Sequence, residues 1–290
     1  MEMIVVIVIT GILAGIVAVF IRGPIDSYFD MARRADLSDV ADTAVRRMAR
    51  DLRRSLANTP RNPTNGSDQC IEFMPVKTGA RYRADQTAAS AGDILDFSTT
   101  DASFDMLGTN ATLPASDQLA AGDVVVVYND GSTSGNAYAG TNAIQIAAGG
   151  VGAGDTANTT KLSFVAAGAT IFTRKAFPSA SPANRFQVLS SAEQVAAYYC
   201  NGGTLFRYSR TIAARTTAWS QPATCAAMVA GATASTLATN VSRCSIVYQP
   251  PGAGSVTGRQ GLVSISLEMN NITSGEAVSL YNQVHLDNSP

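Results

Sequence analysis

The pattern of apolar and polar residues divides the chain into an uncharged start and a mixed remainder. Residues 3–21 carry no charged side chain, and Glu2 and Arg22 stand at the two ends of this run. A helix of about 20 apolar residues crosses the hydrocarbon core of a bilayer. The pattern therefore predicts a transmembrane helix over residues 3–21, with an ordinary membrane anchor as one interpretation. A signal peptide is disfavoured, because no Lys or Arg precedes the run and no Ala-x-Ala site follows it.

The pattern becomes amphipathic after Gly23-Pro24, a pair that predicts a helix break or kink. Apolar or small residues then recur near helical spacing as far as Leu56, while charged residues occupy the other faces. We therefore expect residues 1–56 to form an N-terminal helical segment that lays an apolar stripe on the rest of the chain. Opposite charges four residues apart stabilise a helix by about 0.2–0.5 kcal/mol per pair. The predicted pairs are Asp30/Arg34, Asp42/Arg46 and Arg47/Asp51.

Residues 57–290 predict a β-rich head, because apolar and polar residues alternate in several short runs. The stretch 84–183 is rich in Ala, Gly, Ser and Thr, and it is interpreted either as a β insertion that carries a binding surface or as variable surface loops. The predicted fold class is α+β: a long N-terminal helix, with an apolar transmembrane half and an amphipathic second half, packed on an antiparallel β-sheet head with a β/loop insertion. The predicted strands are 70–76, 94–98, 123–128, 161–165, 186–189, 194–199, 204–209, 241–248, 261–269 and 276–286.

The cysteines favour two disulfides in an exported protein, because their number is even. Four cysteines allow three connectivities, and sequence does not fix the choice. The favoured pairs are Cys225–Cys244, which closes the shortest loop, and Cys70–Cys200, whose flanks both resemble strands. Buried free thiols are the alternative. No metal site is expected, because no Cys-x-x-Cys spacing occurs and His285 is the single histidine.

Composition and motifs limit the function. The formal net charge is −1, so no basic excess points to a nucleic-acid partner. The chain lacks a phosphate-binding Gly-x-x-x-x-Gly-Lys loop, a Gly-x-Ser-x-Gly elbow and a His-Glu-x-x-His helix. We therefore expect no enzyme activity, no catalytic residues and no cofactor; a membrane-anchored hydrolase is the interpretation that these absences disfavour.

The run that begins Glu2-Met3-Ile4-Val5-Val6-Ile7 resembles the N-terminal prepilin methylation segment of type IV pilins and type II secretion pseudopilins. In that family a basic leader ending in Gly and a Phe-Thr-Leu stretch precede the glutamate; neither is present in this sequence. The runs Ala32-Arg33-Arg34-Ala35-Asp36-Leu37 and Cys70-Ile71-Glu72-Phe73-Met74-Pro75 resemble the MshO branch of minor pilin-like proteins of mannose-sensitive haemagglutinin (MSHA) pili. The resemblance to this branch, with its PilW-like and J-type pseudopilin relatives, covers roughly residues 2–83 and 195–290.

The resemblance implies a structural minor pilin-like subunit of an MSHA-type type IV pilus, which acts in fibre assembly or initiation by helix packing. It implies that Glu2 is the subunit-assembly residue and pairs with the free N-terminal amine of a neighbouring subunit. The implied partners are other pilins or minor pilins through the N-terminal helix, the inner membrane before assembly, and prepilin peptidase. The implied location is a single pass of the inner membrane of a Gram-negative bacterium with a periplasmic head, and then the extracellular pilus. A pilus-tip adhesin and a type II secretion pseudopilin are the alternatives.

Overall fold

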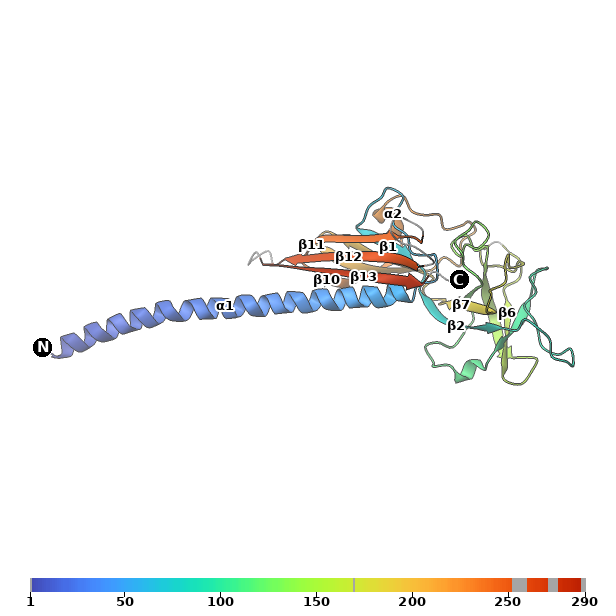
Figure 1. Ribbon diagram of the computed structural model, residues 1–290, viewed down its shortest axis with the longest axis horizontal. Helices are drawn as coiled ribbons and strands as arrows, with labels where there is room; N and C mark the ends of the chain where they lie inside the picture. Colours follow the sequence, from blue (N-terminus) through green and yellow to red (C-terminus); the bar gives the residue numbers. More distant parts are fainter. Residues whose placement is uncertain (1, 169, 252–259, 271–275, 288–290) are drawn as a thin grey trace.

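A long helix projects from a β-rich body in the computed structural model (Figure 1). The structure describes residues 2–168, 170–251, 260–270 and 276–287, except for the side chains at 18 and 21–26. Helix α1 (Glu2–Arg53) is continuous over 52 residues and passes through Gly23-Pro24, where the sequence predicts a break. It ends where Ser55 forms an antiparallel bridge with Pro75 and Asn58 adopts a φ of 60°, which turns the chain toward the body.

Two antiparallel sheets form the part of the body that lies along α1 (Figure 1). Helix α1 contacts strands β10, β12 and β13 of these sheets. The four-stranded sheet has the order β1 (Cys70–Phe73), β8 (Val195–Asn201), β9 (Thr204–Arg210) and β10 (Thr233–Thr239); the three-stranded sheet has the order β11 (Val241–Gln249), β12 (Gln260–Asn270) and β13 (Ala277–Asp287).

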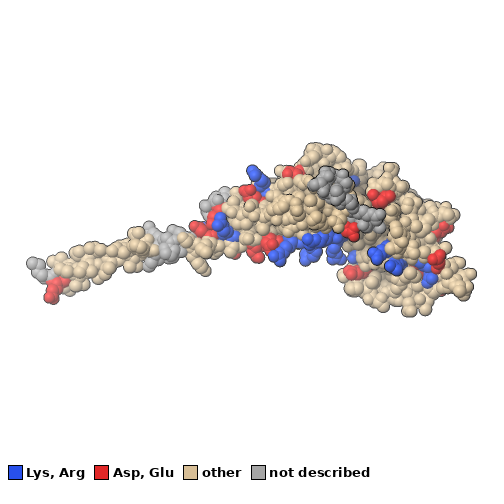
Figure 2. Space-filling view, in the orientation of Figure 1, with Lys and Arg blue, Asp and Glu red and all other residues tan. Residues whose placement is uncertain are grey.

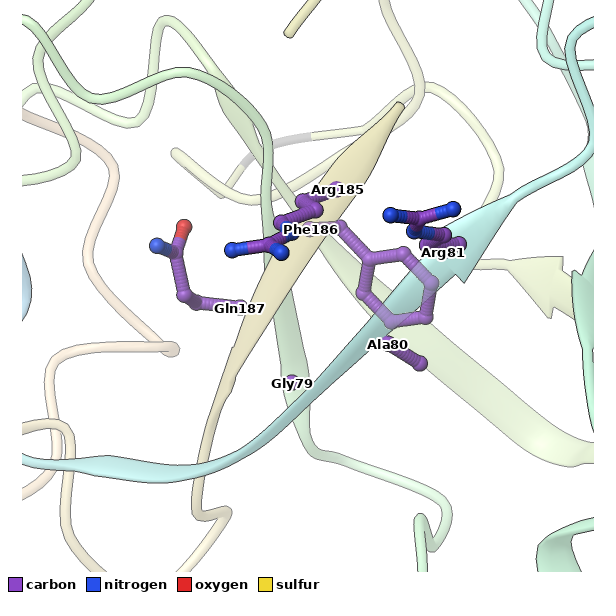
Figure 3. Close-up of a pocket in the computed structure, with 6 residues that line it drawn as sticks. All are labelled: Gly79, Ala80, Arg81, Arg185, Phe186 and Gln187. Atoms are coloured by element: carbon purple, nitrogen blue, oxygen red, sulfur yellow. The ribbon is translucent and has the colours of Figure 1, made fainter. Parts of the chain in front are cut away.

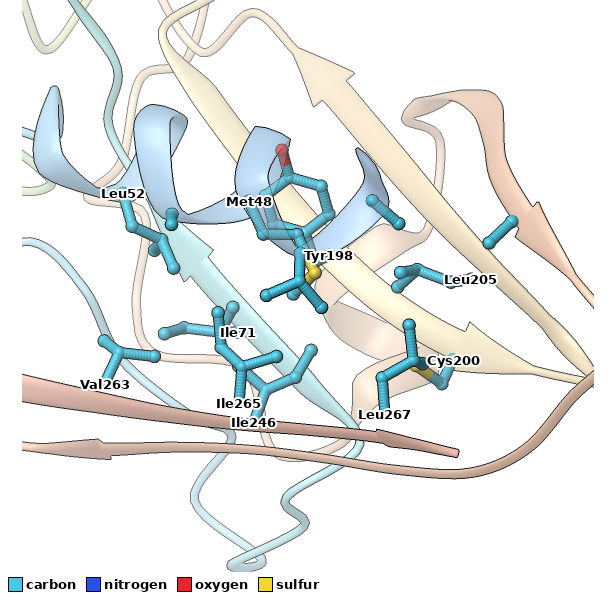
Figure 4. Packing of buried hydrophobic residues seen from close by; sticks show 14 of the residues in the cluster. Met48, Leu52, Ile71, Tyr198, Cys200, Leu205, Ile246, Val263, Ile265 and Leu267 are labelled. Atoms are coloured by element: carbon cyan, nitrogen blue, oxygen red, sulfur yellow. The ribbon is translucent and has the colours of Figure 1, made fainter. Parts of the chain in front are cut away.

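One apolar core joins α1 to both sheets (Figure 4). Met48 and Leu52 of α1 are 1% and 0% exposed, and they lie one helical turn apart on the face that meets the sheets. Ile265 of β12 and Tyr198 of β8 enter the same cluster from the two sheets. Burying each large apolar side chain contributes about 1.5–3 kcal/mol, so this core holds the last third of α1, from Leu37 onward, against the body.

A closed barrel forms the far end of the body, away from the N-terminus (Figure 1). Aromatic side chains fill it: the rings of Phe164 and Phe186 each lie 5.4 Å from that of Phe104. A short 3-10 helix (Asn110–Thr112) lies between two of its strands, and helix α2 (Cys225–Val229) lies outside it. Around the barrel the strand order is β2 (Val76–Tyr82), β3 (Ser103–Leu107), β6 (Thr159–Phe164), β5 (Ala143–Ala153), β4 (Val124–Val126) and β7 (Arg185–Leu189).

The predicted fold class, with a transmembrane half-helix and one antiparallel sheet that carries a β/loop insertion, is wrong. The described residues are mostly β-structure, arranged in two sheets and a barrel. The stretch 84–183 contributes four of the six barrel strands, and the predicted strand at 94–98 does not form. Strand pairing between distant segments, such as β4 with β7, closes the barrel, and a local pattern of residues does not report such pairing.

The predicted membrane pass over residues 3–21 and the inner-membrane location inferred from it are also contradicted. A membrane-spanning helix requires about 20 consecutive apolar residues. Within the residues that the structure describes, no helix has the length and apolar character needed to cross a membrane.

Candidate assembly surface on helix α1

The first two-thirds of α1 is not covered by the other residues that the structure describes. Every described side chain in residues 2–36 is exposed, and Figure 2 shows this part of the helix projecting from the body. Met3, Ile12 and Phe20 are 82%, 59% and 75% exposed. A helix that is apolar all round is normally buried, and exposed apolar surface of this extent marks an interaction site. This part of α1 is therefore the main candidate for a functional surface.

Glu2 lies in the first turn of α1, at the start of the projecting helix. Its side chain is exposed, and it forms no ion pair with a described residue. A carboxylate at a helix N-terminus is stabilised by the helix dipole by about 0.3–1 kcal/mol. Its role as the subunit-assembly residue stays a prediction, because that role requires a second chain.

The charged face of the second half of α1 is only partly paired. Arg46 lies 2.7 Å from Asp42, which is the predicted pair. Asp30 meets Arg33, at 3.5 Å, rather than the predicted Arg34. Both pairs are exposed, and exposed ion pairs contribute about 0–1 kcal/mol. These contacts therefore do little to fix the helix.

A partly buried polar network fixes the end of α1 instead. The carboxylate of Asp51 accepts hydrogen bonds from the Tyr198 hydroxyl at 2.7 Å and from Arg207 Nε at 3.0 Å. Arg207 also donates to both oxygens of Glu193, at 2.6 and 3.0 Å. Burial, followed by the nearby Asp51 charge, raises the pKa of Tyr198 above its ordinary value. Asp51 is therefore unavailable for the predicted pair with Arg47, and the network clamps α1 to β8 and β9.

A basic row follows the outer side of α1 beside the two sheets (Figure 2). All four of its members are exposed, and none forms a salt bridge with a described carboxylate. Like charges three or four residues apart on a helix repel one another, so this row is a second surface that an outside partner could stabilise. The basic row consists of Arg47, Arg50, Arg53 and Arg54.

All four cysteines are in disulfides, as predicted, but the favoured pairing is wrong. The bonds join Cys70 to Cys225 and Cys200 to Cys244, with Cα–Cα distances of 5.7 and 6.3 Å. Strand register explains the error. Cys70 is opposite Tyr199 in the β1–β8 pair, so Cys200, one residue further along β8, projects from the other face of the sheet. One disulfide therefore binds α2 to one face, and the other binds β11 to the opposite face.

A second polar network, centred on the buried Glu72, lies where the chain leaves α1. Glu72 is fully buried, and its Oε1 accepts hydrogen bonds from Arg61 Nε and Nη2 at 2.9 and 2.7 Å. Its Oε2 accepts a hydrogen bond from Trp219 Nε1 at 2.9 Å, and the Arg61 guanidinium lies 3.5 Å from the Tyr138 ring centroid. Burial raises the pKa of Glu72, and the Arg61 charge opposes that rise. Both carboxylate oxygens of Glu72 already accept hydrogen bonds from within the chain, so we assign the network a structural role.

The part of the chain that the structure describes holds no group of three or more His, Cys, Asp or Glu side chains placed to bind a metal ion. His285 is an exposed residue of β13. Comparisons with protein-family models, with curated proteins and with solved structures found no match to this chain. The functional argument therefore rests on the surfaces of the molecule itself.

Sequence reasoning missed the clamp formed by Asp51, Tyr198 and Arg207. Asp51 and Arg47 have helical i,i+4 spacing, which favours a local pair, whereas the observed partners come from strands about 150 residues away. The apolar run at residues 195–200 indicates a largely buried strand, but not which helix residue Tyr198 meets. The pattern of residues therefore indicated the apolar surface of α1, whereas only the fold showed which side chains anchor the helix to the body.

Proposed function

We propose that this chain is a structural subunit of a type IV pilus-like fibre, in which the apolar part of α1 packs against the same helix of neighbouring subunits. The observation that carries the proposal is the exposed apolar start of α1, which projects from a body that anchors only the second half of the helix. Covering each large apolar side chain gains about 1.5–3 kcal/mol, so helix bundling would bring a large favourable free energy.

The shape of the chain favours an open assembly. The uncovered surface lies at one end of an elongated molecule (Figure 1), so a neighbour shifted along the helix axis can cover it while its own body remains clear. A head-to-tail contact of this kind, repeated without closure, generates a helical filament. The resemblance of the N-terminal run to type IV pilins and pseudopilins supports the same arrangement, and its likeness to the MshO branch favours a minor subunit that starts the fibre.

In this proposal Glu2 pairs with the N-terminal amine of a neighbouring subunit. Inside a bundle of apolar helices an unpaired carboxylate is strongly destabilising, whereas a close opposite charge compensates much of that cost. The exposure of Glu2 in the isolated chain leaves it available for such a partner.

The test places a charge inside the expected bundle. Ile12→Lys introduces an ammonium where neighbouring helices would meet, and Thr43→Lys introduces the same group on the exposed outer face of the anchored half of α1. Each variant is expressed as the full chain with the cell's other fibre subunits, and its amount in isolated fibres is divided by its total amount. We expect Ile12→Lys to lower this ratio by about tenfold or more, because burying an unpaired charge is costly.

Thr43→Lys should leave the ratio within about twofold of wild type, since exposed substitutions away from special contacts have small effects. Glu2→Gln should lower the ratio while total protein stays constant. Equal incorporation of Ile12→Lys and wild type would refute helix packing as the mechanism. Equal incorporation of Glu2→Gln alone would refute only the pairing role of Glu2.

A further inference from the structure

Two arginines stand directly opposite each other on the outside of the barrel. Arg81 of β2 pairs in register with Arg185 of β7, and both side chains are exposed. Like charges directly opposite in an antiparallel pair are destabilising. Neither arginine forms a salt bridge with a described carboxylate. The pair is therefore a local concentration of positive charge that the described residues do not neutralise.

Three other basic residues on or beside these strands have carboxylate partners. Lys77 of β2 lies 2.7 Å from Asp123, Arg83 lies 3.6 Å from Asp105, and Lys161 lies 3.2 Å from Asp93. Arg174 and Lys175, which follow β6 in the chain, donate instead to backbone carbonyl oxygens. Within the described residues, Arg81 and Arg185 have no carboxylate partner. Arginines without a carboxylate partner inside the barrel are available to bind an external anion.

The arginine pair borders a hollow of about 390 Å³ (Figure 3). Gly79 is paired with Gln187 next to the two arginines, so the position on that face carries no side chain and leaves the hollow open. A Cβ at Gly79 would lie 3.2 Å from the carbonyl oxygen of Phe186, which is tighter than most such contacts. Phe186 is 1% exposed and its ring belongs to the barrel core, so Arg81, Arg185 and Gln187 supply the polar side chains of a hollow that Gly79 and Ala80 also line.

We propose that Arg81, Arg185 and Gln187 bind an oxyanion group of an acidic polysaccharide. Each guanidinium presents a planar fork of N–H donors that matches a carboxylate or sulfate, and the Gln187 amide can donate to or accept from a neighbouring sugar hydroxyl. The hollow is shallow and open to solvent, so it suits a charged group that projects from a long polymer. The site lies at the opposite end of the molecule from the apolar start of α1 (Figure 1), and it does not depend on whether α1 assembles.

The experiment measures binding of the full chain to heparin, which carries both carboxylate and sulfate groups, by isothermal titration at fixed salt. Neutral dextran and inorganic phosphate are titrated in parallel. We expect heparin to bind and dextran not to bind. Arg81→Gln and Arg185→Gln should each weaken heparin binding by about tenfold or more, because each removes charge-assisted hydrogen bonds.

The matched control is Arg243→Gln on β11, which removes the same charge from an exposed position outside both the barrel and the basic row of α1. It should change heparin binding by no more than about twofold. Arg185→Lys keeps the charge but loses the fork, so it should bind more weakly than wild type and more tightly than Arg185→Gln.

An equal loss in Arg243→Gln and Arg185→Gln would overturn the proposal, since binding would then follow total charge. Unchanged affinity in both barrel variants would do the same. Inorganic phosphate that binds as tightly as heparin, with the same loss in the variants, would reject the polysaccharide and leave a free anion as the occupant. Thermal unfolding verifies the fold: both barrel variants should unfold at no lower temperature than wild type, because each removes a like-charge contact.

Discussion

Arg61→Met should leave the carboxylate of Glu72 buried without its cation. In the native chain Arg61 supplies two of the three hydrogen bonds that Glu72 accepts, and Trp219 supplies the third. Met fills a similar volume without charge. Removing one partner of a buried ion pair typically costs about 3–5 kcal/mol of unfolding free energy, because the remaining charge is left desolvated. We therefore expect Arg61→Met to lower stability by that amount at pH 7.5.

The loss should depend on pH with a defined sign. Burial already raises the folded-state pKa of Glu72 above its ordinary value of 4.5, and Arg61 is the main opposing influence. Without Arg61 that pKa rises further, so the folded state binds more protons than the unfolded state at pH values between the two pKa values. Stability then falls as pH increases through this window, by up to about 1.4 kcal/mol per pH unit. The variant should therefore be closest to wild type below pH 4.5 and furthest from it at neutral pH.

Trp219 provides the assay, because it is the single tryptophan of the chain and its indole contacts Glu72. Urea unfolding followed by its fluorescence at pH 4.5 and 7.5 gives the two free energies. The control is the double variant Arg61→Met/Glu72→Met, which removes the buried charge and should lose the pH dependence. A loss below about 1 kcal/mol at pH 7.5, or an equal loss at both pH values, would refute the assignment of Glu72 as a buried, cation-dependent carboxylate.

Two further predictions test the anchoring of the body. The double variant Cys200→Ser/Cys244→Ser should lose about 2–4 kcal/mol of unfolding free energy, measured by denaturant unfolding. A non-reducing peptide map of the wild type should join Cys70 to Cys225. A peptide that joins Cys225 to Cys244 would contradict the structure. Tyr198→Phe should cost about 1.5–3 kcal/mol, because it removes a hydrogen bond to the Asp51 carboxylate. The exposed control Tyr281→Phe should cost less than about 0.5 kcal/mol, and equal losses in the two variants would refute the clamp.

Strands with one buried face could be predicted from sequence. The run 261–269 alternates apolar and polar residues, and β12 (Gln260–Asn270) alternates between more and less buried positions in the same phase. The apolar run of residues 3–20 is also evident in the sequence. The surface against which an apolar run packs is not evident in the sequence, because it depends on partners distant in the chain or outside it.

The barrel could not be predicted, for reasons that particular residues show. In β5 (Ala143–Ala153) buried and exposed positions do not alternate regularly, because the register with β6 shifts between Ile146 and Val151. The predicted strand at 94–98 fails because Asp96 accepts hydrogen bonds from the backbone N–H and hydroxyl of Ser98, at 2.7 and 2.6 Å. These bonds, the Ser98 hydroxyl first, lower the pKa of Asp96 to about 2 and hold a local turn.

The chain enters and leaves the barrel at neighbouring points of one sheet. Phe73, near the exit from β1, is paired directly with Ala196, near the entry into β8. Every barrel strand lies in the segment between these two positions. A long inserted segment whose two ends lie close together does not force apart the strands that flank it. Sequence change in the barrel can therefore alter the outer end of the molecule without altering the register of β1 with β8, and so without moving the helix that those strands help to hold.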